Sequence, residues 1–432
     1  MKVARASTLA LLVSALLVAP GIAEPSVQSG TLPHGATYLI APDAASPTAA
    51  IDLWFRAPDD GYASSVPGLA RVATTAAAAA KLVSGRSLAE SVAHEGGRLT
   101  IEVFPDIIGV GVVVPAEAAR RMLASLSAAY FAPSIDETAL HAAQSDTTIL
   151  AVQQQYEPDL LAHDLLFARL FTSGPAHEPP IPFSAVDVSH VTLDDVTSFV
   201  HRAFRAGNAF VSLAGAVDPA MLSAVTEGNG TSPADAPIYS APARPVPQPL
   251  AQRGALPAIG LAWTGPPISD ERAATALDFV ADYLFRPGTG TFARQLEDGS
   301  ARVALSGQFI TLHDPGVMLV TVDGSDDAGL QSRIADAVNA MQRPLSAAAF
   351  AAAREAFLYH LGSDTQTASA QADNLGWYAA EGAASYAPGG AGYTGFARSL
   401  DPDYVAAMVR RYLKNPAIVR ITPSAPPKGS SS

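Results

Sequence analysis

The sequence contains no cysteine, so no disulfide bond and no lipid-modified cysteine can stabilise or anchor the chain. Stability must come from core burial, and the composition suits this because 49% of the 432 residues are hydrophobic and only 16% are charged. Clusters of basic residues are also missing, and the formal net charge is −13. This acidic balance argues against binding to nucleic acids or to anionic membrane surfaces, because both attract basic proteins.

Long apolar runs are absent beyond the start of the chain, where Met1 to Ala23 has the pattern of a secretory signal. Lys2 and Arg5 form a basic start, Leu9 to Val18 is an apolar run, and cleavage is predicted after Ala23. The run is shorter than a typical membrane span, although an uncleaved N-terminal anchor stays an alternative. We therefore expect a periplasmic or secreted protein of a Gram-negative-type envelope, without an integral membrane segment after signal cleavage.

Composition divides the remaining chain into two halves. Residues 24–226 form the first half, residues 227–254 are a linker rich in proline, and residues 255–424 form the second half. A disordered tail is expected at residues 425–432. Both halves show strands, helices, a hairpin, more helices and a closing strand in that order, which indicates a duplicated domain.

Periodicity and turn residues predict the individual elements of both halves. Strands are expected at residues 30–40, 49–57, 98–104, 107–114, 208–214, 258–263, 303–309, 317–322 and 417–421. Helices are expected at residues 69–82, 87–95, 115–130, 136–155, 158–171, 193–205, 270–285, 292–297, 345–361, 367–381 and 401–413. The fold class is therefore α+β, with two homologous halves that each hold a mostly antiparallel sheet covered by helices.

The helix predicted at residues 69–82 is rich in alanine and almost uncharged, which is typical of a buried helix. It follows a strand and a polar turn, and it opens with Pro67-Gly68-Leu69-Ala70. This stretch resembles the N-terminal half of the pitrilysin/insulinase (M16) zinc peptidases. Three further turn phrases agree with that family: Glu95-Gly96-Gly97, Phe131-Ala132-Pro133 and Leu213-Ala214-Gly215. The resemblance implies two halves that face each other as a clam shell around an unfolded peptide.

The zinc site that the resemblance implies is missing from the sequence. In the family, Gly-Leu-Ala leads directly into the inverted motif H-x-x-E-H. Arg71 stands at the first histidine position, Thr74 at the catalytic glutamate and Thr75 at the second histidine, and the distal glutamate position falls on Ala151. No two of the nine histidines lie four residues apart. We therefore expect no catalytic residues, no metal ligands and no bound cofactor.

The second half lacks the arginine and tyrosine with which active members of the family complete their site. The nearest phrase places Gln295 at the arginine position and Arg302 at the tyrosine position. A shift of one residue brings Leu296 and Val303 there instead. Whether Arg294 or Arg302 replaces the missing arginine is left open at this point, because a one-residue shift redirects the side chain.

Four aromatic residues, Trp377, Tyr378, Tyr386 and Tyr393, lie in or beside a segment rich in glycine and alanine at residues 381–395. They could belong to a mobile lid or a partner-binding surface. The alternative, which we favour, is a loop that packs its aromatic residues onto its own domain.

The resemblance favours a catalytically silent M16 homologue. This chain would be the non-catalytic subunit of a periplasmic zinc peptidase, would pair with an active M16 subunit, and would bind unfolded peptides along exposed strand edges. By itself it would be inactive. The first alternative is an active zinc metallopeptidase with displaced ligands, in which case zinc is the cofactor. The second is a stand-alone peptide-binding or chaperone-like envelope protein.

Overall fold

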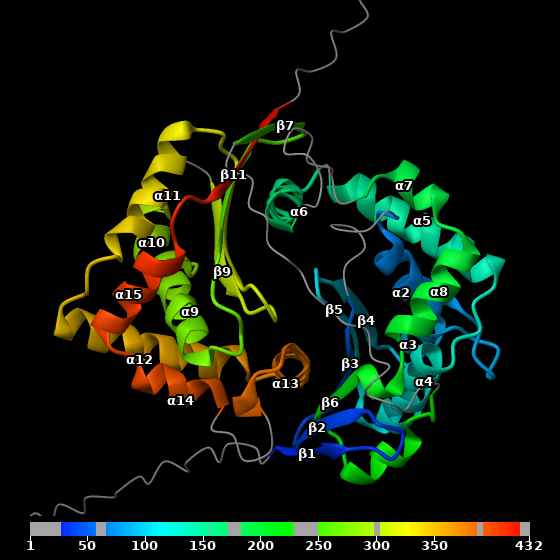
Figure 1. Cartoon of the computed structure of the whole chain (residues 1–432). Helices are drawn as coiled ribbons and strands as arrows, with labels where there is room; N and C mark the ends of the chain where they lie inside the picture. Colours follow the sequence, from blue (N-terminus) through cyan, green and yellow to red (C-terminus); the bar gives the residue numbers. More distant parts are fainter. Residues whose placement is uncertain are drawn as a thin grey trace, which may run out of the picture.

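The computed structural model describes seven stretches of the chain: residues 27–57, 66–154, 156–171, 183–228, 249–297, 303–386 and 392–423. The predicted signal segment, most of the linker and the predicted tail lie outside these stretches. Within the described stretches, two β-sheets face each other across the middle of the molecule, and helices cover the outer side of each sheet (Figure 1).

The first sheet has six strands in the order β1-β2-β6-β3-β5-β4. Its strands are β1 (Gln28–Thr31), β2 (Thr37–Pro42), β3 (Thr48–Arg56), β4 (Arg98–Val103), β5 (Ile107–Pro115) and β6 (Ala209–Gly215). Strands β2 and β6 pair in parallel and the other neighbours pair antiparallel, so the sheet is mostly antiparallel, as predicted. The single strand predicted at residues 30–40 is instead a hairpin, because a turn between Leu32 and Ala36 divides it into β1 and β2.

The second sheet has five strands in the order β7-β11-β8-β10-β9. Its strands are β7 (Leu250–Gly254), β8 (Ala258–Thr264), β9 (Ala304–Ile310), β10 (Val317–Asp323) and β11 (Ala417–Pro423). Strand β7 pairs in parallel with β11, and the other neighbours are antiparallel. Residues 250–254 therefore belong to this sheet, although the sequence places them in the linker.

The outer helices of the first half are α2 (Leu69–Ala79), α3 (Leu88–His94), α4 (Ala119–Phe131), α5 (Glu137–Gln154), α7 (Ala185–His190) and α8 (Leu193–Ala203). Capping boxes at Ser87, Ser184 and Thr192 fix the starts of α3, α7 and α8. Each of these side chains accepts a hydrogen bond from a backbone N–H of the first helical turn that would otherwise have no partner in the helix. Helix α2 is buried along almost its whole length, since its alanines let neighbouring helices approach closely.

The outer helices of the second half are α9 (Glu271–Phe285), α10 (Thr291–Glu297), α11 (Ala328–Ala340), α12 (Ala347–Asp364), α14 (Gly392–Ser399) and α15 (Pro402–Tyr412). Helix α9 is central, and its phenylalanines pack against α10 and α12. Four short 3-10 segments complete the described structure: η1 (Ala116–Ala118), η2 (Ala206–Asn208), η3 (Pro219–Ala224) and η5 (Ala384–Tyr386).

Two remaining helices are exchanged between the halves, and both lie between the two sheets in Figure 1. Helix α6 (Pro158–Phe171) comes from the first half but packs on β8, β10 and β11 of the second sheet. Helix α13 (Ala368–Glu381) comes from the second half but packs on β3, β6 and β2 of the first sheet. The inner face of each sheet is therefore covered by a helix of the other half.

Candidate functional site

The positions of the missing zinc motif lie on two helices that pack against each other, α2 and α5. Arg71 and Thr75 are half-buried one turn apart on α2. Thr74 between them is fully buried, with 0% of its surface exposed, and Ala151 on α5 is 6% exposed. The structure thus brings together the helices that would carry the three ligand positions and the catalytic glutamate.

The side chains at these positions make structural contacts instead of offering metal ligands. Arg71 donates a hydrogen bond from Nη1 to the backbone carbonyl of Ile101 in β4, at 2.7 Å. The Thr74 hydroxyl donates to the Ala70 carbonyl at 2.7 Å, and the Tyr130 hydroxyl donates to the Thr74 carbonyl at 3.0 Å. The Arg71 guanidinium, the hydrogen-bonded Thr74 hydroxyl and the Ala151 methyl group cannot bind a zinc ion, which needs convergent His, Cys or carboxylate donors. In the part of the chain that the structure describes, no group of three such side chains is placed to hold a metal ion.

The positions that correspond to the family's arginine and tyrosine, Gln295 and Arg302, belong to the second half of the chain. Gln295 and Arg294 are exposed on α10, and Leu296 is buried. Arg302 lies outside the described residues, so its role stays a prediction.

A cavity of about 590 Å³ lies between the two halves. Its walls come from both sheets and both exchanged helices. They include Arg71, Phe104 of the β4–β5 turn, Gln308 of β9, His163 of α6 and Trp377 of α13. Strands β4 and β9 are the edge strands of their sheets within the described stretches, and both border this central cavity. An edge strand has free backbone donors and acceptors that can pair with an extended peptide.

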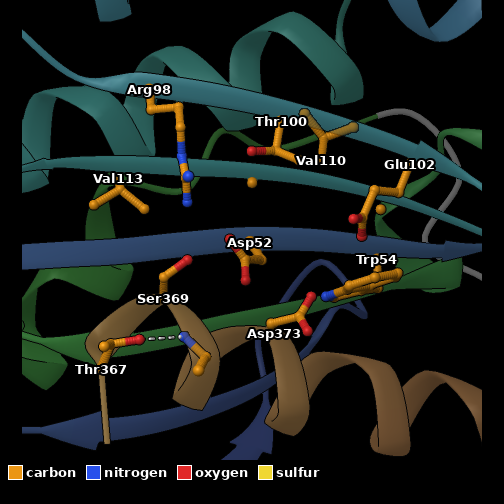
Figure 2. Close-up of a pocket in the computed structure, with 13 residues that line it drawn as sticks. Asp52, Trp54, Arg98, Thr100, Glu102, Val110, Val113, Thr367, Ser369 and Asp373 are labelled. Atoms are coloured by element: carbon orange, nitrogen blue, oxygen red, sulfur yellow. Dashed lines mark hydrogen bonds between the residues drawn. The ribbon is translucent and has the colours of Figure 1, made fainter. Parts of the chain in front are cut away.

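A second cavity of about 320 Å³ opens on the inner face of the first sheet, under the first turns of α13. Figure 2 shows that its polar side chains come from three elements: Asp52 from β3, Arg98, Thr100 and Glu102 from β4, and Asp373 from α13. Glu102 and Asp373 line this inner-face cavity and the central cavity alike, so the two spaces adjoin.

Three carboxyl groups give the inner-face cavity an unusual electrostatic character. Burial raises the pKa of Asp52 well above its usual range, and Asp373 and Glu102 raise it further by repulsion. Loss of solvation also raises the pKa of Asp373 to about 7, with a further contribution from Glu102. The pKa of Glu102 is raised by burial and partly lowered by Arg71. Each carboxyl group therefore holds its proton more tightly than it would in water.

The aromatic residues of α13 pack inside the molecule. The Trp377 ring lies 5.4 Å from Trp54 and 4.7 Å from Phe104, and its Nε1 donates to the Thr311 hydroxyl at 2.9 Å. The Tyr378 ring lies 5.1 Å from that of Tyr393. The Tyr378–Tyr393 contact lies within the second half, as predicted. Trp377 instead packs on Trp54 and Phe104 of the first half and not on its own domain, because α13 covers the first sheet. The Tyr386 side chain lies outside the described set.

A buried polar cluster joins the halves beside Trp377. Asp106 in the β4–β5 turn accepts a hydrogen bond from the His313 backbone N–H, and the His313 ring contacts the Glu381 carbonyl through Nδ1 at 2.9 Å. Arg56 of β3 donates from Nε to the Ala380 carbonyl. These bonds fix the end of α13 against the first sheet.

Sequence reasoning missed the carboxyl groups of the inner-face cavity. Asp52 gave a usable signal, because it is the one charged residue within the apolar run Ala50 to Phe55. Glu102 and Asp373 gave none, since they lie far apart in the chain and meet only through the exchange of α13.

Residues 190–357 match the family model described as the peptidase M16 inactive domain. A solved protease from Helicobacter pylori has the same fold, with a TM-score of 0.76, 16% identity, and coverage of 92% of this chain and all of that one. A peptidase M16 inactive domain from Pseudomonas fluorescens has a TM-score of 0.70 and 17% identity over 93% of this chain and 99% of its own.

This chain has the fold of the M16 peptidases. A chain in the structure of complex III2 from Candida albicans, with Inz-5 bound, shares the M16 fold at a TM-score of 0.72 and 13% identity, over 92% of this chain and 96% of its own. No curated protein has a significant sequence match. Among the described helices, none combines the length and the apolar character that crossing a membrane requires.

Proposed function

We propose that this chain is the non-catalytic subunit of a periplasmic M16 peptidase and binds unfolded peptides in its central cavity. The observation that carries the proposal is the pair of edge strands, β4 and β9, that border one cavity between the halves. A peptide held there would extend either sheet through backbone hydrogen bonds, which requires no catalytic residue. The side chains at the zinc positions support the absence of catalysis, because Thr74 and Ala151 are buried and carry no metal donor.

Support for a partner subunit comes from the family match to an inactive domain and from the fold shared with a chain of a larger complex. The periplasmic location rests on the signal pattern of residues 1–23. The chain would supply a wall of the peptide chamber, and an intact H-x-x-E-H subunit would supply the zinc and the cleavage.

A stand-alone peptide-binding protein is the second candidate. It is favoured by one feature, namely that both walls of the central cavity come from a single chain. An active zinc peptidase with displaced ligands has no comparable support among the described residues, where no metal-ligand group is found.

The test combines binding, metal content and cleavage. The purified mature chain is titrated with a fluorescent unfolded peptide, alone and with a catalytic M16 subunit from the same organism. We expect binding without zinc or cleavage by the single chain, and cleavage only in the mixture. Binding without any effect on a catalytic subunit would favour the stand-alone protein, and stoichiometric zinc with cleavage by the single chain would contradict both.

A matched pair of variants locates the binding. Ser306 is exposed on β9 and lines the central cavity, whereas Ser332 is exposed on the outer helix α11. Ser306→Trp should fill part of the cavity and weaken peptide binding at least about tenfold, and Ser332→Trp should leave it unchanged. Equal affinity in both variants would place the peptide elsewhere.

A further inference from the structure

We propose that the inner-face cavity is a recognition pocket for a cationic side chain, lysine or arginine, of the bound peptide, with Asp52, Glu102 and Asp373 as its acceptors. The inference rests on the proposed peptide binding and adds a substrate preference to it. None of these three residues stands at a position of the family's zinc site.

Asp52 is the strongest indication of a ligand. It lies in the middle of β3 with only 7% of its surface exposed, and it lines the cavity. Figure 2 shows its carboxyl group directed into the space between the sheet and α13, toward Asp373. Within the described part of the chain, no hydrogen bond or ion pair reaches this carboxyl group, and its pKa is set by burial and by its acidic neighbours alone. Buried polar groups in proteins are almost always hydrogen-bonded, so an unmet one that faces a cavity points to a missing partner.

Two glycines of β5 make room for this arrangement. Gly111 lies opposite Asp52 in the sheet, and a Cβ at this position would come within 2.6 Å of Asp52 Oδ1. Gly109 lies opposite Trp54, and a Cβ there would come within 2.5 Å of the indole. Both side chains can therefore lie over the sheet only because their neighbours have none. Both glycines line the pocket and leave room for these two side chains.

The charge of the pocket selects a cation. Among the described residues, none of the three carboxyl groups forms an ion pair, and Arg98 is the basic residue among those that line the pocket. Arg98 is exposed, and Arg71 influences Glu102 from the central cavity. An entering ammonium or guanidinium group would allow all three carboxylates to ionise together, because it offsets their mutual repulsion. An anion would add to that repulsion.

The position of the pocket suits a side chain of a peptide that pairs with β4. Successive side chains of a strand point to opposite faces of the sheet, so every second residue of an added strand would point to the inner face. Glu102 and Asp373 border both cavities, and a side chain could pass between them from the central cavity into the pocket. The volume of about 320 Å³ is large enough for the end of a lysine or arginine side chain.

The test uses two labelled ten-residue peptides, acetylated and amidated, with serine, threonine and valine around one central residue. That residue is arginine in one peptide and citrulline, its neutral isostere, in the other. The intact mature chain should bind the arginine peptide at least about tenfold more tightly. Asp52→Asn and Asp373→Asn should each reduce this preference to less than about threefold, while the citrulline peptide binds as before. Glu355→Gln, on the exposed face of α12, removes one charge elsewhere and should preserve the preference.

The outcomes separate the two proposals. Equal, measurable binding of both peptides by the unaltered chain would overturn the cationic pocket and leave peptide binding intact. A preference that survives both asparagine variants would also overturn it, because general attraction to an acidic protein would then be the cause. Failure to bind either peptide would contradict peptide binding and, with it, the pocket. Because Asp373 is exposed to the cavity, its variant should fold even if that of buried Asp52 does not.

Discussion

The backbone N–H of His313 donates a hydrogen bond to the carboxyl group of Asp106 across the junction of the two halves, with 3.0 Å between N and Oδ2. Asp106 is fully buried there, and Glu381, Asp314 and Arg56 are the charged neighbours in this cluster. The junction is thus joined by a carboxyl group that water cannot reach, and this makes its stability sensitive to pH.

The first prediction concerns that pH dependence. Burial raises the pKa of Asp106 to about 7, from an ordinary value of 3.8. Between these values the unfolded chain loses the proton and the folded chain keeps it, so this group lowers the free energy of unfolding as pH rises from about 4 to 7, by about 4 kcal/mol. Asp106→Asn keeps an acceptor for His313 and should remove most of that decrease. Urea unfolding at pH 5 and pH 8 measures the part of the decrease above pH 5, which is about 3 kcal/mol.

Asp336→Asn, on the exposed face of α11, is the matched control and should unfold with the same pH dependence as the unaltered protein. An Asp106→Asn protein whose stability falls between pH 5 and pH 8 by as much as that of the unaltered protein would show that other groups cause the decrease.

The second prediction concerns the contact of α13 with the first sheet. A Cβ at Gly376 would come within 2.2 Å of Trp54 Cδ1 and 2.4 Å of Ser212 Oγ. Gly376→Ala should therefore push the helix away and lower the free energy of unfolding by about 2 kcal/mol. Gly362 on α12 has open space around it, and Gly362→Ala should instead stabilise the protein by up to about 1 kcal/mol through helix propensity. Equal stability of the two variants would contradict the close approach.

The third prediction concerns the zinc positions. Thr74→Glu places a carboxylate at a site with no exposed surface and should lower the free energy of unfolding by about 3 kcal/mol. Thr75 is half-buried, so Thr75→Glu should cost less than about 1 kcal/mol. Chemical denaturation of both variants compares the two positions. Equal stability of the Thr74→Glu and Thr75→Glu proteins would contradict the prediction, because burial of Thr74 would then not exclude a glutamate at this position.

The fourth prediction concerns Gly111, which lines the inner-face cavity opposite Asp52. Gly111→Ala should displace the Asp52 carboxyl group, because the new methyl carbon would lie 2.6 Å from Oδ1. We expect the preference for the arginine peptide over the citrulline peptide to fall at least about threefold, with a melting temperature within several degrees of the unaltered protein. Titration with both peptides measures the preference. An unchanged preference in a folded variant would mean that Asp52 does not contact the cation.

The sequence predicted most elements because their signals are local. The alanine-rich run that became α2 and the Thr192 cap of α8 are read directly from neighbouring residues. Helix α5 was predicted from residue 136 and begins at Glu137, directly after Asp136, whose side chain accepts a hydrogen bond from the Ala139 N–H. Helices α7, α11 and α14 were missed because they are short or carry a weak apolar pattern.

The candidate site was only half predictable. The family motif located Arg71, which lines the central cavity. Periodicity shows which face of a helix is apolar, but not which sheet covers that face. The packing of α6 and α13 on the opposite sheets therefore could not be read from their sequences. The cavity that combines Asp52 with Asp373 depends on that packing.

The exchange of α6 and α13 also determines how the protein can be divided. A fragment that ends near residue 228 would expose Trp54 and the inner face of β3, and it would carry α6 without the sheet that α6 covers. The second half alone would have the complementary defect. Neither half is then an autonomous folding unit, and the two should unfold in one cooperative transition, even though the sequence reads as a tandem repeat.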